Sequence, residues 1–141
     1  MRLIVMALAL AGGMAMAVQT PAPDGSTLDV VHRFNDAMNR HDAAAVAALL
    51  SDDTVFENTG PAPDGARIVG NAAVAAFWEQ WLVANADARF EAEDVVVAGD
   101  RCTVQWVYRK MRDGKPWHLR GIDVFTVRGG KVAAKLSYVK G

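Results

Sequence analysis

The sequence predicts an α+β domain in which three N-terminal helices pack on a curved, mainly antiparallel sheet. Up to about residue 85, apolar residues recur every three or four positions, whereas from Arg89 onward extended runs alternate with short turns that contain glycine. The chain has 141 residues, 52% of them hydrophobic, which is enough for one core. Helices first and strands last are typical of the α+β class.

The first 17 residues have the pattern of a cleavable signal peptide. Arg2 precedes an apolar run over residues 3–11, and Ala15-Met16-Ala17 is a small-x-small cleavage pattern. The alternative, a retained membrane anchor, needs about 20 apolar residues, and glycines at positions 12 and 13 interrupt the run. We therefore predict cleavage after Ala17, a periplasmic or secreted protein without a membrane association after cleavage, a flexible lead over residues 18–25 and a folded domain over 26–141.

Three helices are expected before residue 85. Ser26 followed by Asp29 indicates a capped helix to about residue 40, and Asp42 caps a shorter helix over residues 43–50. The clearest helix starts with Asn71 as its cap, because Val74 and the apolar residues at 77, 78, 81 and 82 form one face. Residues 60–70, rich in Pro and Gly, are expected to form a loop.

Strands are expected at residues 54–56 and, after the third helix, at 90–98, 102–111, 117–127 and 131–139. The last four are separated by the pairs Gly99-Asp100, Asp113-Gly114 and Gly129-Gly130, which are typical of two-residue hairpin turns. Consecutive hairpins predict an antiparallel meander.

Composition argues against several classes of partner. Fifteen Lys plus Arg against sixteen Asp plus Glu give a net charge of -1, so nucleic acid is not an expected partner. Cys102 is the single cysteine and is expected to be a packed core residue. The three histidines, at positions 32, 41 and 118, lack metal-ligand spacing, and no phosphate-binding glycine motif occurs, so neither a metal nor a cofactor is expected.

Four parts of the sequence resemble a known family. They are the passage from residues 39–42 to residues 56–58, residues 120–125, residues 130–132 and residues 136–140. Their order resembles the nuclear transport factor 2-like superfamily, and within it the SnoaL-like branch. The resemblance implies a cystatin-like α+β cone with one conical cavity, and it implies an inward carboxylate at Asp123. In ketosteroid isomerases of this superfamily that carboxylate is protonated and donates a hydrogen bond to an oxyanion.

Asp123 is the candidate catalytic acid or oxyanion donor. If it points inward, alternation along the strand places Trp117, Leu119, Gly121 and Phe125 on the same face and His118, Arg120, Ile122 and Val124 on the other. A carboxylate among apolar neighbours must be paired, protonated or functional. The following hairpin brings Lys135 near, so a structural ion pair remains an equal alternative.

The resemblance does not extend to two known chemistries. The positions that match the ketosteroid isomerase base and tyrosine hold Asn58 and Phe34, and an amide cannot accept the proton. The last-strand aspartate of limonene-epoxide-hydrolase-like enzymes matches a position near Ser137. Both reactions, by those mechanisms, are therefore disfavoured.

The function expected from the sequence is that of an exported SnoaL-like domain that binds a small apolar or aromatic metabolite in a conical pocket, with acid/base isomerase, cyclase or hydrolase activity as one use of it. The alternative is a non-catalytic binder, or a homodimer or partner-docking module that uses the outer face around Ile122 and Val124. A homodimer is the expected assembly. The residues expected to bind the ligand are Asn58, Tyr138, Trp78, Trp106, Trp117 and Phe125.

Overall fold

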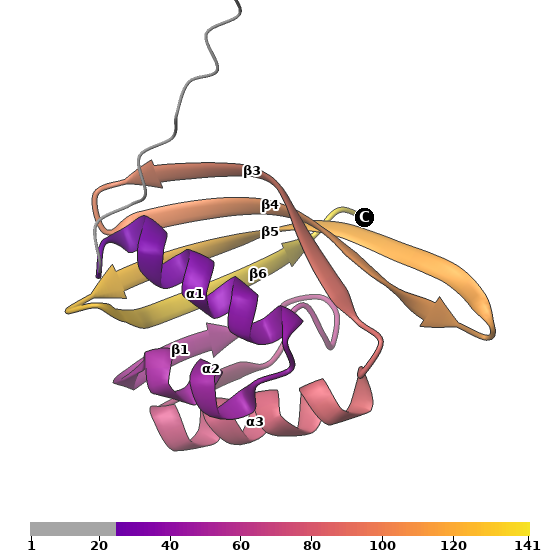
Figure 1. The fold of residues 1–141 in the computed structure, drawn as a ribbon, viewed down its shortest axis with the longest axis horizontal. Helices are drawn as coiled ribbons and strands as arrows, with labels where there is room; N and C mark the ends of the chain where they lie inside the picture. Colours follow the sequence, from indigo (N-terminus) through magenta and orange to yellow (C-terminus); the bar gives the residue numbers. More distant parts are fainter. Residues whose placement is uncertain (1–24) are drawn as a thin grey trace, which may run out of the picture.

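The computed structural model describes residues 25–141, so the expected signal peptide and residues 18–24 of the lead lie outside the described residues. Helices α1 (Thr27–Asn39), α2 (Ala43–Leu49) and α3 (Asn71–Ala84) cover one face of a curved sheet (Figure 1). Six strands form that sheet in the order β2-β1-β6-β5-β4-β3. The pair β1–β6 is parallel and the other four pairs are antiparallel, which confirms the predicted class.

The caps of the first two helices are those that the sequence predicts. Ser26 Oγ accepts a hydrogen bond from the Asp29 amide at 3.2 Å, and Asp42 Oδ1 accepts one from the Ala45 amide at 2.9 Å. Each bond satisfies an amide that has no partner inside its helix. Helix α1 then buries its apolar stripe, comprising Val30, Val31, Phe34, Ala37 and Met38, against the sheet.

The predicted cap of the third helix is wrong. Gly70 is the N-cap of α3, and no side chain caps it. Asn71 Nδ2 instead donates to two carbonyl oxygens near the end of α2, that of Ala47 at 3.2 Å and that of Leu50 at 3.1 Å. Ala47 lies in the last turn of α2 and Leu50 is its C-cap residue, and the Ala47 carbonyl oxygen also accepts a bond from the Leu50 amide. Asn71, the first residue of α3, therefore joins α3 to α2 rather than capping α3.

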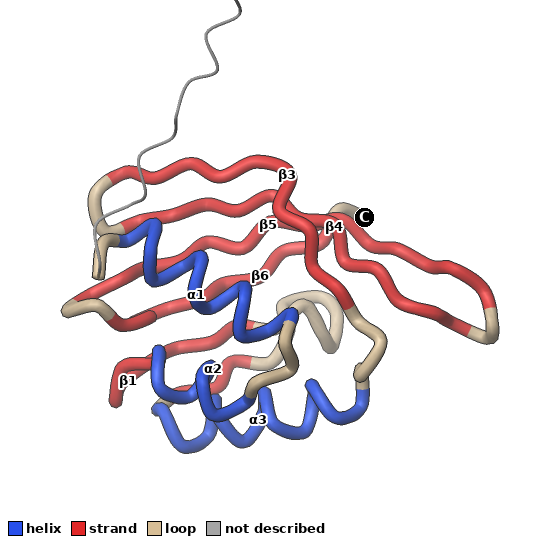
Figure 2. The backbone as a smooth tube through the Cα atoms, in the orientation of Figure 1, coloured by secondary structure: helices blue, strands red, loops and turns tan. Residues whose placement is uncertain are grey.

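The strands are β1 (Leu50–Glu57), β2 (Arg67–Val69), β3 (Arg89–Ala98), β4 (Arg101–Arg112), β5 (Lys115–Arg128) and β6 (Lys131–Val139) (Figure 2). The last four form the predicted meander. Two expectations were too narrow. Strand β1 starts at Leu50, where it pairs with Val132, and the expected loop contains β2, whose Val69 pairs with Val55. Pairing with strands distant in the sequence decides both boundaries, so local patterns do not predict them.

Strands β4 and β5 extend beyond their neighbours. They pair from Arg101 with Thr126 to Arg112 with Lys115, but the β3 ladder begins at Arg109 and the β6 ladder ends at Gly121. Residues 110–119 therefore form a two-stranded hairpin, here called the hairpin arm, which projects past the rest of the sheet (Figure 1).

Gly121 lies directly opposite Trp106 in the β4–β5 ladder. A Cβ atom at position 121 would clash with the indole ring of Trp106 and with the Tyr138 carbonyl oxygen. The missing side chain therefore leaves room for the indole to lie across the neighbouring strand. Trp106 is thereby placed on the inner face of the sheet, where it contributes to the site described next.

Within residues 25–141, no helix is both long and apolar enough to cross a membrane.

Candidate functional site

A cavity of about 560 Å³ lies between α3, the end of β1 and the inner faces of β4, β5 and β6. This volume falls within the range of small-molecule sites in proteins. Most of its apolar wall consists of aromatic side chains from four of the strands and from α3: Phe56, Trp78, Trp81, Phe90, Trp106, Tyr108 and Trp117. Several of these rings contact one another: the ring centre of Trp81 lies 5.9 Å from that of Phe90 and 5.8 Å from that of Tyr108, in tilted arrangements that present a large aromatic surface to a ligand.

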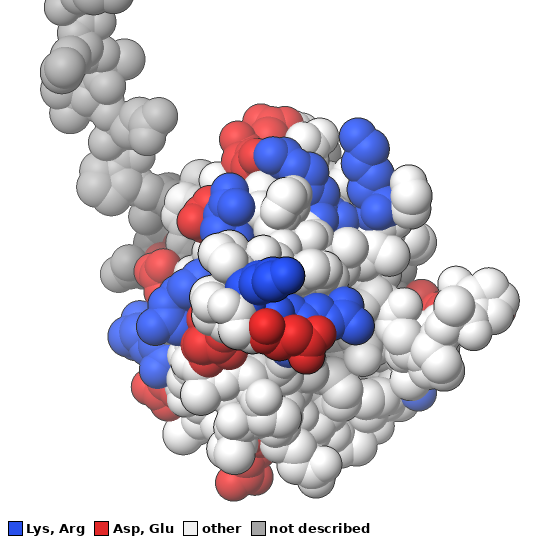
Figure 3. Space-filling view, turned by 90° about the vertical axis from the view of Figure 1, so that its right-hand side faces the viewer, with Lys and Arg blue, Asp and Glu red and all other residues white. Residues whose placement is uncertain are grey.

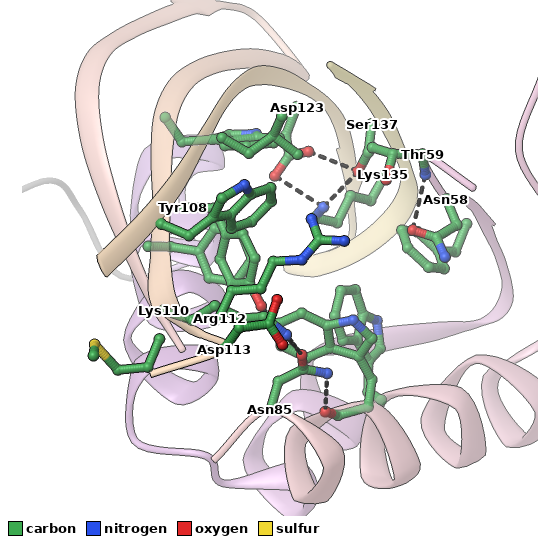
Figure 4. Close-up of a pocket in the computed structure, with 18 residues that line it drawn as sticks. Asn58, Thr59, Asn85, Tyr108, Lys110, Arg112, Asp113, Asp123, Lys135 and Ser137 are labelled. Carbon is green, nitrogen blue, oxygen red and sulfur yellow. Dashed lines mark hydrogen bonds and ion pairs between the residues drawn. The ribbon is translucent and has the colours of Figure 1, made fainter. Parts of the chain in front are cut away.

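A buried polar cluster of Asp123, Lys135 and Ser137 forms one side of this cavity (Figure 4). Lys135 Nζ lies 2.8 Å from Asp123 Oδ2 and donates to Ser137 Oγ at 2.8 Å, while Ser137 Oγ donates to Asp123 Oδ1 at 2.7 Å. The β5–β6 register pairs Asp123 with Ser137, and Lys135 precedes Ser137 by two residues, so the three side chains share the inner face.

The environment of Lys135 explains how a charge is tolerated there. The residue is only 7% exposed and Asp123 only 4%. The ammonium lies 5.3, 5.5 and 5.6 Å from the ring centres of Phe56, Trp78 and Phe125, close enough for cation–π attraction. The ammonium also contacts the Asp123 carboxylate, so the structure contains the Asp123–Lys135 pair that the sequence offered as one alternative.

A second polar group surrounds Asn85 at the end of α3. Asn85 Oδ1 accepts hydrogen bonds from Tyr108 Oη at 3.2 Å and from Lys110 Nζ at 2.9 Å, and Asn85 Nδ2 donates to the Trp81 carbonyl at 2.8 Å. Burial, with a smaller contribution from the negative charge of Asp87, raises the pKa of Tyr108 to about 12. Tyr108 is therefore a neutral hydrogen-bond donor at neutral pH.

Five of the seven candidate residues line the cavity: Asn58, Trp78, Trp106, Trp117 and Asp123. The predicted inward face of β5 is also correct, because Trp117, Leu119 and Asp123 all contact the cavity. Trp106 and Tyr108 also face inward, because both line the same cavity.

Two candidates are misplaced. Phe125 is fully buried in the core and does not line the cavity. Its ring centre lies 5.6 Å from the Lys135 ammonium. Tyr138 is 53% exposed and lies on the outer face of the sheet, beside a shallow hollow that it shares with Arg120 and Ile122. The register explains the error, because Tyr138 pairs with the outward residue Ile122, whereas its neighbour Ser137 pairs with the inward Asp123.

The sequence reasoning missed the polar residues of the hairpin arm and of α3. Lys110, Arg112 and Asp113 line the cavity together with Asn85. Alternation along β4 from Trp106 and Tyr108 would have placed Lys110 and Arg112 on the inner face. Asn85 could not have been found in this way, because the end of a helix has no such alternation.

The indole nitrogen of Trp106 is a buried donor. Within residues 25–141, Trp106 Nε1 makes no hydrogen bond. A buried polar group without a partner is rare in folded proteins, since leaving it unpaired costs about 1–3 kcal/mol. Among residues 25–141, no group of three His, Cys, Asp or Glu side chains is placed to hold a metal ion.

The chain resembles known proteins in sequence and in fold. The protein-family model of the SnoaL-like domain matches residues 31–135. An NTF2-like protein of unknown function from Mesorhizobium loti is 37% identical, with a TM-score of 0.73 over 87% of this chain and 98% of that one. A putative polyketide cyclase from Sinorhizobium meliloti is 26% identical, with a TM-score of 0.64 over 77% and 93%. No curated protein matches the chain.

An LEH-like epoxide hydrolase from M. tuberculosis is similar to this chain in fold only. The identity is 22% and the TM-score 0.66, over 81% of this chain and 82% of that one. The same scaffold thus occurs in proteins with different names, so the chemistry of this chain must be argued from its own residues.

The buried ion pair leads to a prediction about stability. Lys135→Met leaves the Asp123 carboxylate buried without its cation, so we expect the free energy of unfolding to fall by about 3–5 kcal/mol. The double variant Asp123→Leu/Lys135→Met leaves neither charge and should lose less than the single variant. Urea unfolding monitored by circular dichroism measures both changes.

The matched control is Arg109→Met, which removes one partner of an exposed pair with Glu91 whose side chains are 50% and 57% exposed. Such a pair contributes about 0–1 kcal/mol. If Lys135→Met lowered the free energy of unfolding by no more than Arg109→Met does, the predicted cost of leaving Asp123 without its cation would be wrong.

Proposed function

The chain belongs to the SnoaL-like family, and on that premise we propose that it binds a small, flat, largely apolar organic molecule in the aromatic cavity, with one polar group of that molecule beside Asp123, Lys135 and Ser137. The observation that carries the proposal is the position of this polar cluster in the wall of a cavity that is also lined by seven aromatic side chains. Apolar walls with a few convergent polar groups are typical of sites that bind and orient one small molecule.

A purely structural role for the cluster explains less. Replacing a buried ion pair with packed apolar side chains is often neutral or stabilising, so stability alone does not account for its presence. The cluster also faces open volume instead of being enclosed by the core.

The binding proposal predicts that the full-length chain binds the neutral fluorophore N-phenyl-1-naphthylamine, whose fluorescence rises in an apolar site. Leu119→Trp should weaken this binding about tenfold or more, because Leu119 lines the cavity and an indole there would occupy ligand volume. A fluorescence titration gives the dissociation constant of each variant.

Val96→Trp is the matched control, since it adds the same indole at a position that is 56% exposed on β3. Its affinity for the fluorophore should equal that of the wild type. Equal affinities in all three proteins would place the bound fluorophore outside the cavity, and no binding to the wild type would contradict the proposal.

A second candidate function is proton transfer to or from the bound molecule, as an acid/base isomerase, cyclase or hydrolase would require. It is favoured by one feature of Asp123. Each carboxylate oxygen accepts one bond, from Ser137 or from Lys135, and each retains another lone pair. Asp123 would act as general base, and Lys135 would stabilise negative charge that develops on a substrate oxygen.

Proton transfer predicts that the protein accelerates exchange of the α-protons of 2-tetralone, a flat bicyclic ketone, for solvent deuterium. Asp123→Asn should lower that acceleration by about a hundredfold or more, because the amide cannot accept the proton. Proton NMR measures the exchange rate. The variant should still bind N-phenyl-1-naphthylamine, and unchanged exchange in Asp123→Asn would rule out this role for the carboxylate.

Export and dimer formation are also part of the proposal, and they rest on the sequence. Export is supported by the pattern at residues 1–17, and it predicts Val18 as the first residue of the protein recovered from its cells. A homodimer is supported by apolar residues on the outer face of the sheet, among them the half-buried Ile122 and Val124. Sedimentation velocity would give twice the chain mass if this is right.

A further inference from the structure

The rim of the cavity formed by the hairpin arm carries two cationic side chains. Lys110 and Arg112 are two residues apart on β4, so they share its inner face, and both line the cavity. Figure 4 shows Arg112 extending from the arm into the cavity, with Lys110 and Asp113 beside it. Figure 3, which looks at the end of the molecule where the arm projects, shows basic and acidic side chains gathered across the middle of that face.

Neither cation has a carboxylate partner among residues 25–141. Lys110 Nζ donates to the neutral oxygen Oδ1 of Asn85 at 2.9 Å, and the Arg112 guanidinium lies 5.4 Å from the ring centre of Trp117. Four other arginines of the sheet, Arg67, Arg109, Arg120 and Arg128, each form an ion pair with a carboxylate. Lys110 and Arg112 instead keep donors with remaining hydrogen-bonding capacity at the edge of the cavity.

The charges around the cavity do not cancel. Its lining includes the cations Lys110, Arg112 and Lys135 and the carboxylates Asp113 and Asp123. Asp123 is paired with Lys135, which leaves two cations and one carboxylate at the rim. The nearby Asp87 does not line the cavity, and its Oδ2 accepts a hydrogen bond from the backbone amide of Met111 at 2.7 Å. The side chains that line the rim therefore carry a net positive charge beside the aromatic wall, with the Asp87 carboxylate outside that lining.

From this distribution we infer that the ligand is an organic anion: an aromatic or other flat ring system, buried against the aromatic wall, whose carboxylate, sulfonate or enolate oxygen lies at the rim between Lys110 and Arg112. The inference rests on the proposed binding function and names the chemical class of its ligand. A guanidinium presents parallel donors that match a carboxylate, and both attractions strengthen when the ring system displaces water from the cavity.

The alternative is that both residues are ordinary solvated charges of an exposed hairpin. The arm is open to solvent, and Arg112 itself is exposed. Solvated charges would attract an anion only weakly. Removing them would therefore change the affinity for an anionic probe no more than the affinity for a neutral probe with the same ring system. A pair of such probes therefore separates the two explanations.

The probes are 8-anilinonaphthalene-1-sulfonate and N-phenyl-1-naphthylamine, which differ only by the sulfonate. Fluorescence titration of the full-length chain gives a dissociation constant for each. In the double variant Lys110→Met/Arg112→Met, we expect the affinity for the sulfonate to fall about tenfold or more and the affinity for the neutral probe to stay within about twofold. Asp113→Asn should strengthen binding of the sulfonate only, because it removes the carboxylate at the rim.

Arg109→Met is the matched control, since it removes a cation from β4 that lies outside the cavity lining and should leave both affinities unchanged. Retained affinity for the neutral probe shows that the double variant is folded. If the double variant bound the sulfonate as tightly as the wild type, or if Arg109→Met weakened it equally, anion recognition at the rim would be overturned while cavity binding stood. Failure of the wild type to bind either probe would overturn the binding proposal itself.

Discussion

The ion pair between Asp123 and Lys135 is the constraint on which the inner face of the sheet depends. Two charges that are 4% and 7% exposed are costly to remove from water, and they remain stable there only because each meets the other at 2.8 Å and both contact Ser137. The aromatic rings around the ammonium supply further attraction. The β5–β6 register must therefore be kept, since a shift of β6 by one residue would turn Lys135 and Ser137 to the outer face, away from Asp123.

The same register separates two surfaces with different properties. Ser137 and Asp123 face the helices, whereas their neighbours Tyr138 and Ile122 face outward. Inner residues of β4 follow this division, with Trp106 placed across Gly121 because glycine leaves the necessary space. The cavity thus arises from strands that are too curved and too long for the three helices to fill their inner face completely.

The hairpin arm adds a third element to the site. Because β4 and β5 continue past their neighbours, Lys110, Arg112 and Trp117 extend the cavity wall beyond the sheet. The site therefore has a charged and hydrogen-bonded cluster inside, an aromatic middle and a cationic rim. Such a gradient fits a molecule with a polar group at each end of a flat apolar body, and it links the binding proposal to the inferred anionic ligand.

The sequence by itself determined the class of fold, the helices and the hairpin turns, because each depends on local periodicity or turn chemistry. The family resemblance implied the inward position of Asp123, and the hairpin after β5 made Lys135 one candidate partner. Only the tertiary structure decided the start of β1, the existence of β2, the bonding of Asn71, the outward position of Tyr138 and the convergence of Asn85 with Lys110. These features depend on contacts between residues distant in the chain, and no local pattern records the register that brings them together.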